Sequence, residues 1–236
     1  MAGFTGAPPI VTDGLVFAVD AANKDSYSGS GTTWKDLSGN GNDGTLTNGP
    51  TFDSGNGGNL TFTSDDYTNF QNGSIFNLTS DFTLSVWFKP YNGTHGNYAG
   101  IFCKDGAGNF GNWGFFGDAS SNYVRFGFLN TSSVQQQTLN SSYLDLDTTN
   151  WVNYQGVYSS SNTTLLLYRN GTLISTKSNV SGTPQTNSNN VYVGIRNAGS
   201  SNRFNGSISN CSIYNKSLSP SEITQNYNAL KGRFNL

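Results

Sequence analysis

The chain has 236 residues and a net charge of −2, and 11% of its residues are charged while 14% are aromatic. Few charges and many aromatic residues allow a sizeable buried core, which excludes an intrinsically disordered protein. The 12 Lys and Arg residues are scattered, whereas proteins that bind nucleic acid gather cations on one face to neutralise phosphates. We therefore expect a folded protein without a nucleic-acid partner.

The first residues lack the basic and apolar segments of a secretory signal, so we expect none. No apolar run approaches the ~20 residues that a membrane span needs, which predicts no span. Residues 1–14 read as an extended arm, because Pro8 and Pro9 disfavour a helix. With Phe4 and Ile10 these prolines form a candidate assembly arm, which packs either on neighbouring copies or on its own domain.

Most of the chain alternates between apolar and polar residues, the pattern of half-buried strands. In the segment Phe82–Lys89, for example, the apolar residues at even positions share one face. Asn170–Gly171 supplies the positive φ angles of a tight turn, which predicts a hairpin over Leu165–Thr176. The predicted strands are Leu15–Asp20, Leu60–Phe62, Phe82–Lys89, Ala99–Lys104, Gly114–Gly117, Asn122–Leu129, Trp151–Tyr158, Thr164–Arg169, Thr172–Thr176, Val191–Arg196 and Ser207–Tyr214.

One helix is predicted near the C-terminus, over about Pro220–Leu230. Ser219 and Glu222 form a capping box, and Pro220 stands at the first helical position. No repeat or linker divides the chain, so we expect a single domain over residues 15–236. The fold class is all-β, an antiparallel jelly-roll sandwich with one short C-terminal helix. Within it, the cysteines Cys103 and Cys211 are expected to be buried free thiols.

Several motifs, in this order and spacing, resemble laminin-G-like domains of the concanavalin A-like lectin/glucanase superfamily. The resemblance covers about Leu15–Leu230 and departs from the family at Asn205 and Ser209, where an Asp is common. A calcium or sugar site that depends on those two carboxylates is therefore not expected. The motifs are Phe82–Pro90, Trp151–Tyr154, Leu167–Gly171, Val193–Ile195, Phe204–Ile208 and Ile213–Ile223.

Further stretches resemble a narrower group, found in structural proteins of tailed bacteriophages. They are Asp13–Val16, Tyr27–Asn42, Gly44–Leu46 and Asn228–Phe234. This resemblance implies a capsid-decoration or tail-associated protein on the virion surface, in contact with other virion proteins and with copies of itself. Release by host lysis would then explain the missing signal.

The superfamily includes glucanases, so catalysis needs a test on the residues. Glycosidases usually place two carboxylates around the scissile bond. The only glutamate is Glu222, which the capping box already uses, and Asp65 and Asp66 are adjacent, so a strand would point them to opposite faces. The only histidine, His95, lies in a Gly- and Asn-rich loop. We therefore expect a protein that is not an enzyme.

Two kinds of ligand site remain open. Calcium takes six to eight oxygen ligands from flexible loops. The candidate metal residues are Asp65 and Asp66, and Ca²⁺ is the candidate cofactor. Sugars need an exposed aromatic platform, for which Trp113, Tyr98 and Tyr123 are the candidates. For Trp113, a structural role in which it covers a sheet edge fits the sequence equally well. The other tryptophans, Trp34, Trp87 and Trp151, are assigned to the core.

These observations lead to a ranked set of functions. The first is a non-enzymatic structural protein that displays a lectin-like sandwich on a phage particle. The alternative is a calcium-assisted carbohydrate-binding adhesin for host-surface glycans, a role that one protein can combine with the first. A glycoside hydrolase is the distant third.

Overall fold

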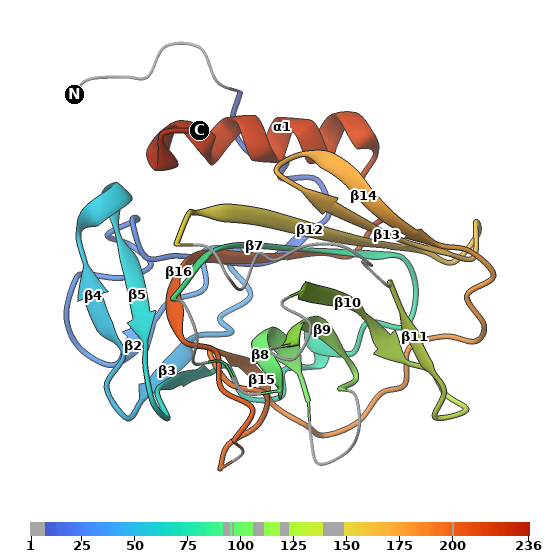
Figure 1. Cartoon of the computed structure of the whole chain (residues 1–236), viewed down its shortest axis with the longest axis horizontal. Coiled ribbons are helices and arrows are strands. Elements are labelled where there is room, and N and C mark those ends of the chain that lie inside the picture. Colours follow the sequence, from blue (N-terminus) through green and yellow to red (C-terminus); the bar gives the residue numbers. More distant parts are fainter. Residues whose placement is uncertain are drawn as a thin grey trace.

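The computed structural model describes residues 8–91, 95, 97–105, 111–118, 123–138, 149–199 and 201–236. Two antiparallel sheets pack face to face, and the helix α1 (Pro220–Leu230) lies across the outer side of one of them (Figure 1). This is the predicted sandwich with a short C-terminal helix.

Sheet A is the sheet beneath α1. Its central strand β16 pairs with β7 along one edge, and along the other it pairs with β5 and then with β1. Its strands, in spatial order, are β14 (Thr172–Lys177), β13 (Thr164–Arg169), β12 (Val152–Ser159), β7 (Phe82–Pro90), β16 (Gly206–Tyr214), β5 (Asn59–Phe62) and β4 (Thr51–Asp53), with β1 (Leu15–Asp20) beside β16.

Sheet B forms the opposite layer. Its strands, in spatial order, are β11 (Gln135–Gln137), β10 (Tyr123–Leu129), β9 (Trp113–Asp118), β8 (Asn97–Lys104), β15 (Val191–Val193), β6 (Tyr67–Asn69), β3 (Gly44–Thr47) and β2 (Thr33–Trp34). Short 3₁₀ turns over Gly55–Gly57, Ser74–Phe76 and Lys231–Phe234 complete the regular structure.

The core between the sheets follows the period-2 pattern of the sequence. Phe82, Leu84, Val86 and Phe88 of β7 all point into it, as predicted, and the intervening Trp87 points outward beneath the C-terminal segment. The hairpin prediction is also confirmed, since Asn170 and Gly171 both have positive φ between β13 and β14. Of the predicted core tryptophans, Trp34 is 0%, Trp87 1% and Trp151 9% exposed.

The helix begins with the predicted capping box. The Ser219 hydroxyl accepts from the Glu222 amide, and the Glu222 carboxylate accepts from the Ser219 amide at 2.8 Å. The hydrogen bond from the Ser219 amide to the Glu222 carboxylate is the main cause that lowers the pKa of Glu222. The ion pair with Lys216 lowers it further. The only glutamate therefore serves the helix terminus.

One sequence expectation needs adjustment and another is confirmed. The strand expected over Val191–Arg196 ends at Val193, because Gly194 adopts φ +89° and the chain leaves the sheet there. The expected thiols are confirmed: Cys103 and Cys211 are both buried and unpaired, and burial raises the pKa of each well above its ordinary value.

Candidate functional site

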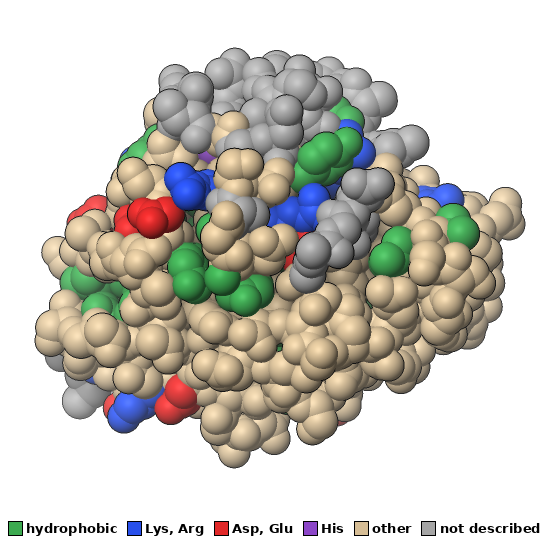
Figure 2. Space-filling model, turned by 90° about the horizontal axis from the view of Figure 1, so that it is seen from below, with side chains coloured by type: hydrophobic (Ala, Val, Ile, Leu, Met, Phe, Trp, Pro, Cys, Tyr) green, Lys and Arg blue, Asp and Glu red, His purple; other side chains and the backbone are tan. Residues whose placement is uncertain are grey.

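The outer face of sheet B, opposite α1, carries an open cleft of about 380 Å³. Figure 2 views this side of the molecule, where uncharged polar groups dominate and a few hydrophobic side chains gather near the middle. The cleft is lined by amide, hydroxyl and aromatic side chains together with one acid: Asp105, Ser188, Asn189, Asn190, Tyr192, Asn197 and Ala198.

Tyr192 provides the aromatic wall of the cleft. Val191 and Val193 of β15 point into the core, so strand alternation turns Tyr192 to the outer face. On the neighbouring strand β6, Tyr67 meets Tyr192 edge to face, with ring centroids 5.9 Å apart and planes at 70°. The two rings support each other, as aromatic pairs in this geometry do.

A buried asparagine fixes the loop that lines the cleft. Asn112 is 2% exposed; its Nδ2 donates to the Gln185 carbonyl at 2.8 Å, and its Oδ1 accepts from the side chains of Asn187 and Asn189. The Asn189 amide in turn donates to Asn187 Oδ1 at 3.0 Å. The side chains of Asn187 and Asn189 are thus held in place before any ligand arrives.

The acid of the cleft is neutralised within the protein. Asp105 and Arg196 are 3% and 5% exposed and form a buried ion pair. Arg196 also lies over the ring of Phe116, with its guanidinium carbon 5.9 Å from the ring centroid. The Asp105 carboxylate therefore accepts a hydrogen bond from Arg196, which compensates its charge inside the protein.

Two of the three predicted sugar-site residues come together on this same outer face. The Arg125 guanidinium lies 5.0 Å from the ring centroid of Tyr98 and 4.9 Å from that of Tyr123. Arg125 also donates to the Tyr123 hydroxyl at 2.6 Å. Tyr98 is 36% exposed, so this stack of aromatic and guanidinium planes is open to solvent.

The third predicted residue is elsewhere. Trp113 is 1% exposed and packs edge to face against Phe102 in the core, while its indole N–H donates to the Phe76 carbonyl at 2.8 Å. Trp113 and Phe115 share the inward face of β9, whereas the flanking glycines and asparagines had suggested a surface loop. Trp113 is therefore a core residue and offers no exposed platform.

The predicted metal residues lie in the turn between β5 and β6. The Asp66 carboxylate accepts from the amide and hydroxyl of Thr63 at 3.0 and 3.1 Å, which ties it to the turn. Asp65 is exposed, and its carboxylate accepts from Asn48 at 3.1 Å. Within the described part of the chain, no three His, Cys, Asp or Glu side chains form a metal-binding cluster. Calcium binding stays a prediction.

The candidate arm is described from Pro8 onward, and Phe4 lies outside the described residues. Gln225 of α1 donates to the Pro9 carbonyl at 2.8 Å, and the Val11 amide donates to Asn226 Oδ1 at 2.8 Å. This part of the arm therefore docks on its own domain, one of the two alternatives that the sequence left open.

A family model described as the concanavalin A-like lectin/glucanases superfamily matches residues 62–224. The chain belongs to this superfamily. The search of curated proteins found no match to this chain. Among the described residues no helix is long and apolar enough to cross a membrane.

Several solved structures share the fold of this chain at low sequence identity. Domain 4 of AbnA, a GH43 extracellular arabinanase from Geobacillus stearothermophilus in complex with arabinotriose, is 18% identical with a TM-score of 0.70, covering 90% of this chain and 98% of that one. The binding domain of botulinum neurotoxin DC in complex with SialylT is 17% identical with a TM-score of 0.71, covering 93% and 52%.

An enzyme occurs among the similar structures as well. A Trypanosoma rangeli sialidase in complex with the inhibitor DANA is 15% identical with a TM-score of 0.64, covering 92% of this chain and 33% of that one. The chain thus spans about half the length of the toxin binding domain and a third of the sialidase. These likenesses establish the fold that the sequence predicted.

Proposed function

We propose that this protein is a carbohydrate-binding domain that holds an oligosaccharide in the cleft on the outer face of sheet B. The observation that supports this most directly is the composition of the cleft: a tyrosine ring beside the amides of Asn189 and Asn190 and the hydroxyl of Ser188. Amides and hydroxyls match the donors and acceptors of sugar hydroxyls, and an aromatic ring matches the apolar face of a sugar ring.

Preorganisation favours the same role. The network around Asn112 holds the Asn189 side chain before binding, which reduces the ordering cost of binding. Two similar structures are complexes, one with arabinotriose and one with SialylT. Because the Asp105 carboxylate is paired with Arg196, we expect an uncharged sugar in the part of the cleft that this pair borders.

We propose binding without catalysis. Glycoside hydrolysis requires two suitably spaced carboxyl groups. Among the residues that line the cleft only Asp105 is acidic, and Glu222 caps α1 on the far side of the sandwich. A hydrolytic assay on every glycan that binds tests this directly, and release of reducing sugar that disappears in Asp105→Asn would contradict it.

A glycan array, read with and without a calcium chelator, identifies the ligand and tests calcium assistance. For a glycan that binds, we expect Tyr192→Ala to weaken affinity at least about tenfold, which corresponds to about 1.4 kcal/mol. Titration calorimetry measures the change. Tyr192→Phe is the matched control and should retain most of the affinity, since it keeps the ring. A blank array in both conditions, or equal affinity in Tyr192→Ala, contradicts the proposal.

Presentation on a phage particle is a separate proposal, supported by the sequence resemblance. Deleting residues 1–7 tests it better than a longer deletion, because Val11 keeps its buried contacts with Asn226 and Tyr214. We expect the shortened domain to melt at the same temperature and to be missing from assembled particles, measured by calorimetry and by mass spectrometry of purified virions. If the shortened protein is incorporated normally into particles, residues 1–7 have no role in assembly.

A further inference from the structure

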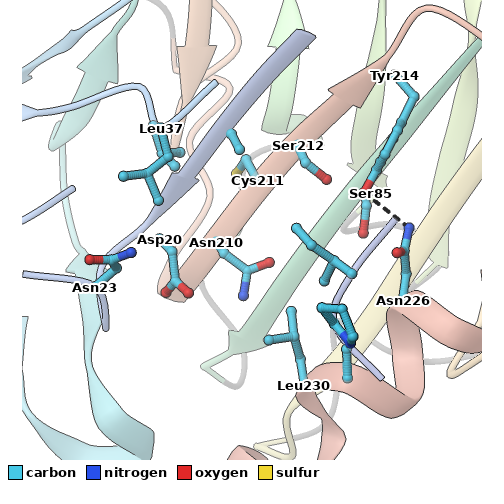
Figure 3. Close-up of a pocket in the computed structure, with 15 residues that line it drawn as sticks. Asp20, Asn23, Leu37, Ser85, Asn210, Cys211, Ser212, Tyr214, Asn226 and Leu230 are labelled. Atoms are coloured by element: carbon cyan, nitrogen blue, oxygen red, sulfur yellow. Dashed lines mark hydrogen bonds between the residues drawn. The ribbon is translucent and has the colours of Figure 1, made fainter. Parts of the chain in front are cut away.

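A second cavity, of about 300 Å³, lies between α1 and the outer side of sheet A, on the face opposite the proposed sugar cleft (Figure 3). Its size is at the lower end of the roughly 300–1,000 Å³ that is typical of small-molecule pockets. The lining comes from β1, β7, β16, α1, the N-terminal arm and the loops that carry Asn23 and Leu37.

The floor of this cavity is polar. Ile213 of β16 points into the core, and the alternation of the strand turns Asn210 and Ser212 outward, with Ser85 of β7 paired directly beside Ser212. Asn210 is 8% exposed, and its Nδ2 has no hydrogen-bond acceptor within the described part of the chain. An unpaired buried amide is costly, so a ligand oxygen that accepts from it stabilises the complex.

The walls are apolar and the charges are balanced. Ala229 and Leu230 of α1, Ile10 of the arm and the partly exposed Leu37 surround the floor. The acid of the lining, Asp20, forms a 2.8 Å ion pair with Arg233. A charged ligand would therefore lose its hydration without gaining a counter-ion from Asp20, which favours an uncharged one.

The rim is held in place by buried hydrogen bonds. The Tyr214 hydroxyl donates to the Val11 carbonyl at 3.0 Å and accepts from Asn226 at 3.2 Å. Burial raises the pKa of Tyr214 to about 12, so this hydroxyl keeps its proton under all ordinary conditions. The arm therefore forms a fixed side of the cavity next to α1.

We propose that this cavity is a second binding site, for a small uncharged molecule with a carbonyl oxygen at one end and a compact hydrocarbon body. The carbonyl accepts from Asn210 on the floor, and the hydrocarbon contacts Leu37, Ala229 and Leu230. The site lies on sheet A, so it does not depend on the sugar cleft of sheet B.

Cyclohexanecarboxamide is a suitable probe, and cyclohexanecarboxylate is its charged counterpart. In titrations of the ¹⁵N-labelled protein up to 20 mM probe, we expect the carboxamide to shift the side-chain NH₂ signals of Asn210 with saturation, and the carboxylate to bind at least tenfold more weakly. A crystal soaked with the carboxamide should place its oxygen on Asn210. Unshifted Asn210 signals, or only ordered water on the floor, would overturn the proposal.

Two substitutions on α1 locate the site. Ala229→Leu adds volume inside the cavity and should weaken carboxamide binding at least tenfold. Thr224→Leu adds volume on the exposed side of the same helix and should leave the affinity unchanged. If Ala229→Leu prevents folding, the wild-type titration and the soaked crystal still decide the question. Equal weakening by both variants would place the probe elsewhere.

Discussion

Replacing Phe234 by alanine is expected to lower the free energy of unfolding by about 3–5 kcal/mol. Phe234 is 5% exposed and lies in the last 3₁₀ turn. Its ring stacks on Trp87 with centroids 4.2 Å apart and lies 4.7 Å from the ring of Trp151. Alanine would leave a cavity beside two tryptophans and release the chain end that covers them.

Urea denaturation followed by tryptophan fluorescence measures this loss, because the two tryptophans report on their own environment. Phe234→Leu, which keeps most of the buried volume, should cost markedly less than the alanine variant. Leu236→Ala is the matched control for a change near the terminus: Leu236 is 47% exposed, so its loss should stay within about 0.5 kcal/mol. A loss below 1 kcal/mol in Phe234→Ala would mean that the tail does not support Trp87.

Part of the fold could be predicted from the sequence because some of its elements follow local patterns. The capping box at Ser219, the hairpin at Asn170–Gly171 and the alternation of β7 are local patterns, and the structure reproduces all three. Short strands such as β2 and β6 have only two or three residues, so they offer no period to detect. They form by pairing with other short strands of sheet B: β2 pairs with β3, and β6 pairs with β3 and with the distant β15.

The candidate site was less accessible to prediction, and for a different reason. Tyr192 could have been assigned to the outer face of its strand, because it alternates with two valines of the core, although only 7% of it is exposed. The role of Asn112 could not, because it depends on hydrogen bonds to Asn187 and Asn189, far away in the chain. Trp113 was placed with the exposed candidates because its glycine- and asparagine-rich neighbours resemble a loop.

Lys104 is the source of the second large expected effect, a dependence of stability on pH. The side chain is fully buried, and its Nζ donates to Asn72 Oδ1 at 2.6 Å and Asn77 Oδ1 at 2.8 Å. Both acceptors are neutral amides, which compensate a buried charge only in part. Burial therefore lowers the pKa of Lys104 from 10.5 to about 8.

The sign of the effect follows from proton linkage. Below pH 8 the lysine is protonated in both states, and the folded protein bears the full cost of the buried charge. Between the folded and unfolded pKa values the folded state releases its proton while the unfolded state keeps it, so stability rises with pH. Relative to a variant without this group, the wild type should gain about 2 kcal/mol between pH 7 and pH 9.5.

Lys104→Met provides that variant, and chemical denaturation at the two pH values gives the free energies of unfolding. The buried thiols have the opposite effect, because their raised pKa makes the folded state lose stability as pH rises through the unfolded value. They are present in both proteins, so the difference between wild type and variant isolates Lys104. If the difference in the free energy of unfolding between wild type and Lys104→Met is the same at pH 7 and pH 9.5, Lys104 remains charged in the folded protein.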